Sequence, residues 1–81
     1  DGLRLYRLYG TSACHLCEQA EALVVMALRN GARCSVEDID ISESDALMAR
    51  YGERIPVLAH PDGRELNWPF SASDVERFLA A

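Results

Sequence analysis

The sequence has no apolar run long enough to cross a lipid bilayer. Its longest run, residues 22–28, is much shorter than the roughly 20 residues that a membrane-spanning helix needs. The N-terminal residues also lack the charged segment and apolar stretch of a secretory signal. These absences predict a cytoplasmic protein with no membrane partner.

A surplus of positive charge is missing as well. The 81 residues include 8 Lys plus Arg against 13 Asp plus Glu, which gives a formal net charge of −5, and no basic run compensates for it. Non-specific binding to nucleic acid draws most of its affinity from Lys and Arg side chains that neutralise phosphates. We therefore expect no nucleic acid among the partners.

Cysteine is scarce, because the chain has three residues of this type, an odd number and too few for a small secreted disulfide scaffold. Neither an internal repeat nor a linker rich in Pro, Gly or Ser divides the chain. At this length one modest core can form. We expect a single domain over residues 1–81 that acts as a monomer.

The spacing of apolar residues predicts seven elements in the order β-α-β-α-β-β-α. The strands are expected at residues 3–9, 34–41, 55–60 and 64–66. The helices are expected at residues 14–30, capped by Thr11 or Ser12, and after the capping segments 42–45 and 71–74. The first two strands should be parallel, whereas the tight turn at residues 61–63 should close an antiparallel hairpin. This predicts an α/β domain with a four-stranded mixed sheet flanked by helices.

The second strand has an irregular apolar pattern. Cys34 and Val36 share one parity, whereas Ile39 and Ile41 share the other. A bulge or an early strand end near Asp38 would explain the change.

The most informative feature is the pair Cys14 and Cys17, at the junction of the first strand and the first helix. Residues i and i+3 of a helix lie about one turn apart, within the Cα separations that a disulfide spans. Unpaired amide N–H groups and the helix dipole stabilise an anion in the first turn, so the Cys14 thiolate should form readily. We expect Cys14 to be the nucleophile and Cys17 to be the resolving thiol.

Two other interpretations fit the same spacing. Cys-x-x-Cys is also a zinc-ligand spacing, and His15, Cys34 and His60 offer further donors, although no second pair of this kind is present. Alternatively, both cysteines only pack. The position of the pair on a strand-to-helix turn favours redox chemistry. Cys34 is expected to be a buried small hydrophobe.

The whole chain resembles the glutaredoxin-like branch of the thioredoxin fold. The resemblance rests on an aromatic strand end at Tyr9, a short polar turn, the Cys14-His15-Leu16-Cys17 motif, a strand ending in Glu-Asp-Ile-Asp, and Ile55-Pro56-Val57 before the hairpin. Residues 65–70, Glu-Leu-Asn-Trp-Pro-Phe, are similar to the closing segment of short bacterial glutaredoxin-like proteins.

This resemblance implies further site residues. Pro56 would be a cis-proline that faces the cysteine pair, and the backbone of Ile55 would turn outward to pair with an extended substrate. Thr11, His15 and Asp74 would complete the substrate site. His15 either tunes the Cys14 thiolate or faces solvent, and Asp74 either meets a glutathione amine or only caps a helix.

Three departures from the glutaredoxin pattern concern glutathione. His15 and Leu16 replace the common Pro and Tyr, no Lys precedes the first cysteine, and residues 68–74 replace a Gly-Gly pair that comes before an Asp. Arg50 and Arg54 lie just before the proline, where they either attract a carboxylate or are simply solvated.

These features predict a thiol-disulfide oxidoreductase that uses Cys14 and Cys17 to reduce or exchange a disulfide in a protein or in a glutathione mixed disulfide. No metal or bound cofactor is expected, and glutathione is a candidate reductant. The alternative is a non-catalytic binding module that keeps the thioredoxin fold and uses the dithiol as a redox-sensitive latch.

Overall fold

The computed structural model describes residues 3–80. Over these residues the expected order β-α-β-α-β-β-α is confirmed, with one additional short 3-10 turn, η1, before the second helix. The bounds are β1 Arg4–Gly10, α1 His15–Arg29, β2 Cys34–Asp40, η1 Ile41–Glu43, α2 Asp45–Tyr51, β3 Val57–Ala59, β4 Glu65–Asn67 and α3 Ala72–Ala80.

The four strands form one mixed sheet, as predicted, and their order in the sheet is β2-β1-β3-β4. β1 and β2 run parallel, because α1 carries the chain back to the end of the sheet at which β1 starts, and β2 begins there. β3 is antiparallel to both β1 and β4. β1 and β3 are the two interior strands. β1 ends, and β3 begins, at the end of the sheet where α1 starts.

The predicted bulge in β2 is wrong. The register with β1 is continuous past Asp38, from the pair Arg4 and Cys34 to the pair Gly10 and Asp40. The parity changes because opposite faces of the strand are covered at its two ends. Cys34 and its same-parity neighbours face the main core, whereas Ile39 packs into a second cluster on the other face.

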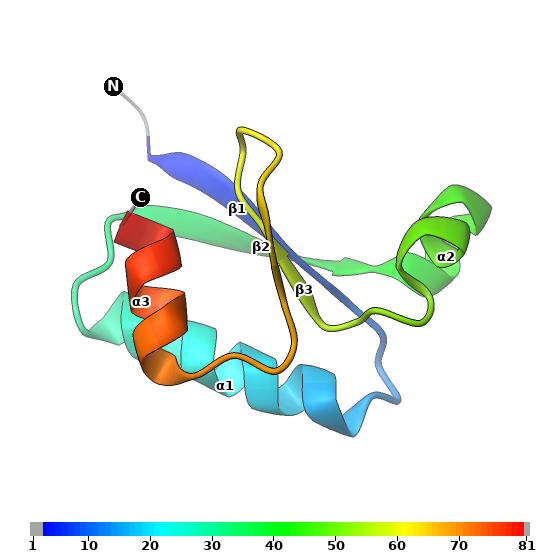
Figure 1. Cartoon of the computed structure of the whole chain (residues 1–81), viewed down its shortest axis with the longest axis horizontal. Helices are drawn as coiled ribbons and strands as arrows, with labels where there is room; N and C mark the ends of the chain where they lie inside the picture. The colour runs from blue at the N-terminus through cyan, green and yellow to red at the C-terminus, as the bar shows by residue number, and fades with distance from the viewer. Residues whose placement is uncertain (1–2, 81) are drawn as a thin grey trace.

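Two clusters of apolar side chains hold the layers together. α1 and α3 lie side by side over one face of the sheet, and α2 stands apart from them at one end of the molecule (Figure 1). The main cluster joins the first face to α1 and α3 through the buried residues Tyr6, Leu8, Ala20, Val24, Ala27, Cys34, Leu58, Phe70, Val75 and Leu79. The smaller cluster joins the other face to η1 and α2 through Tyr9, Ile41, Tyr51 and Val57.

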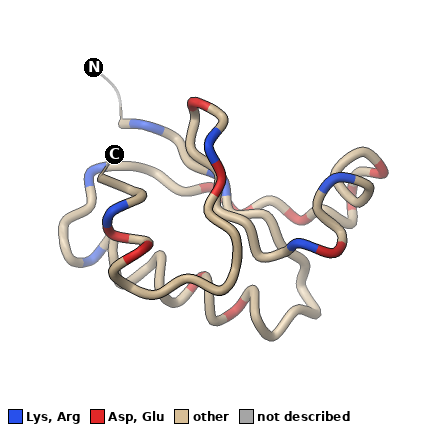
Figure 2. The backbone as a smooth tube through the Cα atoms, viewed as in Figure 1, with Lys and Arg blue, Asp and Glu red and all other residues tan. Residues whose placement is uncertain are grey.

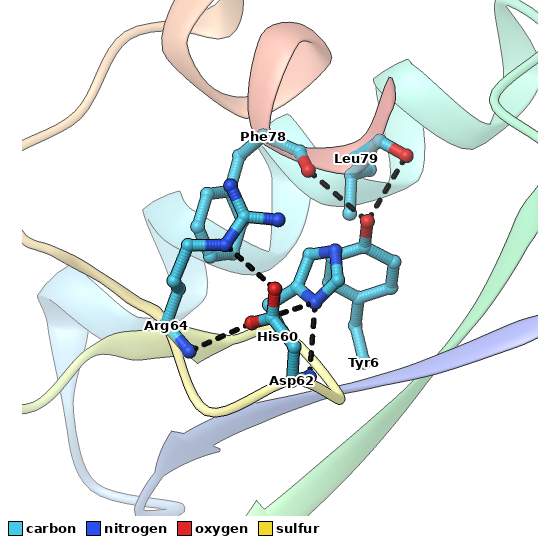
Figure 3. Close-up of polar contacts among 6 residues, drawn as sticks. All are labelled: Tyr6, His60, Asp62, Arg64, Phe78 and Leu79. Carbon is cyan, nitrogen blue, oxygen red and sulfur yellow. Dashed lines mark hydrogen bonds and ion pairs between the residues drawn. The ribbon is translucent and has the colours of Figure 1, made fainter. Parts of the chain in front are cut away.

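The C-terminal helix is tied to the first strand by a buried polar contact. The Tyr6 hydroxyl donates to the backbone carbonyls of Phe78 and Leu79, each at 3.1 Å (Figure 3). Carbonyls in the last turn of a helix have no partner within the helix, so Tyr6 supplies one. The ring of Tyr6 also meets the His60 ring edge-on at 4.9 Å. His60 is therefore buried against an aromatic ring of the core, and its Nδ1 accepts a hydrogen bond from Asp62 N–H at 3.0 Å in the turn that follows.

The β3–β4 turn follows its predicted chemistry. Gly63 adopts a φ of +102°, a conformation that L side chains rarely adopt. Asp62 fixes the turn by accepting hydrogen bonds from the backbone N–H and the guanidinium of Arg64, at 2.9 and 2.8 Å (Figure 3).

Charge is interspersed along the chain. Basic and acidic segments alternate along the backbone, and no basic tract forms (Figure 2). Within residues 3–80, the helices are all too short or too polar to cross a membrane.

Candidate active site

The cysteine pair lies between the end of β1 and the first turns of α1. Cys14 and Cys17 form a disulfide, with their Cα atoms 5.2 Å apart. Cys14 is the N-cap residue of α1, and its sulfur accepts a hydrogen bond from the backbone N–H of Cys17 at 3.1 Å. The expected cap at Thr11 or Ser12 is wrong, because the helix begins at His15 and the sulfur takes the position of a capping oxygen.

The two cysteine residues differ in exposure. Cys14 is half-buried, whereas Cys17 is only 9% exposed. The more exposed cysteine is thus the one that caps α1, and the better covered cysteine lies one helical turn further on.

A cavity of about 330 Å³ opens beside Cys17, between the end of β1, the start of α1 and the end of β2. Its wall is formed by Leu8, Gly10, Thr11, Ser12, Cys17, Glu18, Glu21, Asp38, Ile39 and Asp40. Four of these residues carry carboxylates, and none carries a positive charge.

The carboxylates of this wall act on one another. A side-chain hydrogen bond to Asp38 raises the pKa of Glu21, because two neighbouring carboxylates resist ionising together. Hydrogen bonds from Ser42 lower the pKa of Asp40 and keep it ionised. This acidic wall was not among the site residues predicted from the sequence. Its signal is that Glu21 is one helical turn from Cys17 and that Asp38 has the parity of the core-facing residues of β2.

The peptide bond between Ile55 and Pro56 is cis. Val57 pairs with Tyr9 in the sheet, so one residue further along this register Pro56 lies opposite Gly10 at the edge that carries the cysteines. Pro56 is fully buried, and its carbonyl accepts a hydrogen bond from Trp68 N–H at 3.3 Å.

The resemblance implies that the backbone of Ile55 is free to pair with a substrate, but its N–H group already has a partner within the chain. Its backbone N–H donates to the carbonyl of Tyr51 at 3.1 Å, in the turn that follows α2. The side chain is half-buried against the cluster around Tyr51.

The other three predicted site residues occupy different positions. Thr11 is half-buried and lines the same cavity as Cys17. His15 is exposed at the first position of α1. Asp74 lies in α3, where it accepts a hydrogen bond from Ser71 N–H at 2.9 Å and another from Arg77 at 2.8 Å. Both Asp74 oxygens are thus used in capping and pairing at this helix.

Arg50 and Arg54 are not simply solvated. Arg54 donates hydrogen bonds to Glu65 and, at 3.0 Å, to Asn67, and Arg50 lies 3.6 Å from Glu65. Both guanidinium groups lie 5.2 Å from the centre of the Tyr51 ring. The arginines therefore neutralise a carboxylate of this chain and brace α2 against β4.

The zinc interpretation requires donors that the fold separates. Cys34 pairs with Arg4 at the start of β1, whereas Cys14 follows the other end of that seven-residue strand, about 20 Å away. Among residues 3–80, no three His, Cys, Asp or Glu side chains lie close enough together to hold a metal ion.

Comparison with known structures shows where this arrangement recurs. Protein XcR50 from X. campestris is similar over 91% of this chain and 93% of its own, with 40% sequence identity and a TM-score of 0.79. Protein Ne2328 from Nitrosomonas europaea is similar over 96% and 93%, with 26% identity and a TM-score of 0.73. A mutant thioredoxin from Halobacterium salinarum NRC-1 is similar over 98% and 74%, with 25% identity and a TM-score of 0.73.

Comparison with curated proteins gives no match. The family model described as "Glutaredoxin-like domain (DUF836)" matches residues 6–80, which include the cysteine pair and the whole sheet except Arg4 and Leu5 at the start of β1. The chain therefore belongs to the glutaredoxin-like domain family and has the thioredoxin fold.

Proposed function

We propose that this protein is a thiol-disulfide oxidoreductase in which Cys14 attacks a substrate disulfide and Cys17 resolves the product. The observation that carries the proposal is the disulfide between these two cysteines at the start of α1, with the more exposed cysteine at the helix cap. Cysteines that only packed would not need this difference in exposure.

In the first step, the Cys14 thiolate attacks one sulfur of a substrate R–S–S–R′. The Cys14–S–S–R bond forms, and R′–S⁻ leaves and takes up a proton. The Cys17 N–H, which points at the Cys14 sulfur, and the positive end of the α1 dipole stabilise the attacking anion.

In the second step, Cys17 loses its proton and attacks the Cys14 sulfur. The bond between the two cysteines forms, and R–S⁻ leaves and takes up a proton. The substrate has then gained two electrons and two protons, and the protein has reached the disulfide form. A cellular thiol such as glutathione restores the dithiol through the reverse exchange, so the cycle requires no bound cofactor.

We further propose that a protein disulfide is preferred to a glutathione mixed disulfide. Glutathione carries two carboxylates and one ammonium group, and the cavity beside Cys17 would repel its net negative charge. The groups expected to hold glutathione are used elsewhere, since Arg54 pairs with Glu65 and Asp74 pairs with Arg77.

The test is stopped-flow exchange between the reduced protein and two disulfides, a cyclic peptide with flanking Lys residues and oxidised glutathione. We expect Cys14→Ser to lose turnover and Cys17→Ser to stall as a mixed disulfide, visible by mass. Cys34→Ser is the matched control, because Cys34 is buried at the start of β2, at the opposite end of the sheet from the cysteine pair.

Each outcome decides one part of the proposal. Turnover by Cys14→Ser equal to that of the wild type would contradict the oxidoreductase assignment. Exchange no faster than that of a free thiol would favour the non-catalytic module. Equal rates with both disulfides would leave the activity in place and contradict only the preference for protein substrates.

A further inference from the structure

Gly10 is the last residue of β1, and it lies against the buried sulfur of the cysteine pair. A Cβ atom at this position would come within 2.9 Å of the Cys17 Sγ and 3.1 Å of the Cys17 Cβ. Contacts below 3.0 Å between a Cβ and another heavy atom essentially never occur. In the disulfide form the Cys17 side chain can therefore occupy its position only because residue 10 has no side chain.

The backbone at Gly10 does not itself require glycine. Among residues 3–80, the glycines with positive φ are Gly31 and Gly63, whereas Gly10 is part of a regular strand that pairs with Asp40. Alanine can adopt this extended conformation without strain. The position is restricted by the neighbouring sulfur and not by its dihedral angles.

Opening the disulfide requires the two sulfur atoms to separate from about 2 Å to a non-bonded distance of about 3.5–4 Å. The Cα atoms are held 5.2 Å apart by α1, and the Cys14 sulfur is engaged at the helix cap. Rotation of the Cys17 side chain is the simplest movement, and the cavity of about 330 Å³ that Cys17 lines offers room for it.

We propose that Gly10 is a positioning residue that sets the balance between the disulfide and the dithiol. Because Gly10 has no side chain, the Cys17 sulfur can occupy the position in which it bonds to Cys14. A side chain at residue 10 would obstruct this position, whereas the sulfur of the reduced Cys17 can rotate away into the cavity. The inference rests on the proposed function, in which the pair passes between the two states.

The test is Gly10→Ala, equilibrated across buffers of reduced and oxidised glutathione and analysed by mass. The reaction is protein disulfide plus two thiols giving protein dithiol plus one glutathione disulfide. We expect its equilibrium constant to rise about tenfold, equivalent to about 30 mV for this two-electron couple. A constant within twofold of the wild-type value would overturn the inference.

Gly52→Ala is the matched control. Its Cβ would come within 2.5 Å of the Met48 carbonyl oxygen, in the turn after α2, so it also introduces a steric clash. We expect Gly52→Ala to lower the free energy of unfolding equally in the oxidised and reduced forms and to leave the glutathione equilibrium unchanged. Gly10→Ala should instead destabilise the oxidised form more than the reduced form.

A double-mutant cycle covers the case in which Gly10→Ala folds poorly. Replacing Cys17 by Ala removes the atom that the new Cβ would approach most closely. The loss of unfolding free energy caused by Gly10→Ala should then be smaller in the Cys17→Ala background than in the oxidised wild type. An equal loss in both backgrounds would contradict the inference. Neither measurement depends on turnover, so a failure of the proposed activity would be seen separately.

Discussion

The sulfur of Cys14 accepts a hydrogen bond from the backbone N–H of Cys17, so one side chain of the cysteine pair also caps the N-terminus of α1. A serine hydroxyl can take over this capping role, but an alanine side chain cannot. Cys14 therefore has a structural role that can be measured apart from the chemistry proposed for it.

We expect the reduced Cys14→Ala protein to be less stable than the reduced Cys14→Ser protein by about 1 kcal/mol, the usual effect of losing an N-cap acceptor. The measurement is urea denaturation under reducing conditions, followed by circular dichroism. Equal midpoints and slopes for the two variants would show that the sulfur does not act as a cap.

Cys34 should react slowly with alkylating agents. The residue is buried at 7% exposure, and burial raises the pKa of its thiol, so little thiolate is present at neutral pH. Brief treatment of the reduced protein with iodoacetamide should label Cys14 first and leave Cys34 unmodified, as measured by peptide mass. Labelling in urea should reach all three cysteines. Early labelling of Cys34 in the folded protein would contradict the packing described here.

Glu65 should stabilise the fold in a pH-dependent way. The hydrogen bond from Arg54, followed by that from Tyr51, lowers the pKa of Glu65 below its ordinary value of 4.5. A lowered pKa means that the folded state favours the carboxylate, so this stability is present above pH 4.5 and is lost as the pH falls through the lower value.

Accordingly, Glu65→Gln should cost about 1 kcal/mol of unfolding free energy at pH 7, a value kept small because the group is partly solvated. The difference from the wild type should shrink below pH 4.5. Glu53→Gln, an exposed change in the neighbouring loop, is the control and should have little effect at either pH. A difference that grew on acidification would have the wrong sign.

Tyr6→Phe should loosen the attachment of α3. Without the hydroxyl, the carbonyls of Phe78 and Leu79 lose a donor, and we expect a loss of about 1–2 kcal/mol in unfolding free energy. Amide exchange in the last turn of α3 should become faster. Tyr9→Phe is the control, because the Tyr9 ring stacks on Tyr51 with centroids 4.3 Å apart and its hydroxyl makes no hydrogen bond to residues 3–80. Equal losses for both variants would contradict the anchoring role of Tyr6.

Much of the fold could be predicted because the signals that begin and end its elements are local. Asn30 and Gly31 end α1, residues 61–63 form the hairpin turn, and Ser71 with Asp74 caps α3. Each signal depends on a neighbour within a few residues, and the spacing of the cysteine pair is local in the same way.

One error was local, since Cys14 caps α1 in place of Thr11 or Ser12. The other errors arose where distant segments decide the outcome. The parity change in β2 is caused by α2 covering one end of the opposite face, which the residues of β2 cannot indicate by themselves. Arg54 is partnered by Glu65, eleven positions further on, and Asp38 meets Glu21 only through the parallel register with β1. The close approach of Gly10 to Cys17 is likewise a contact between two elements, β1 and the helix α1 that follows it.

The strand that leads into the cysteines and the strand that follows the cis-proline are the two interior strands of the sheet. Edge strands fray first, because they are hydrogen-bonded to a neighbour on one side only. Local opening of β4 should therefore leave Gly10 and Pro56 opposite each other at the end of the sheet that leads into the cysteine pair. Local opening of β2 should instead disturb the cavity beside Cys17, because Asp38, Ile39 and Asp40 form part of its wall.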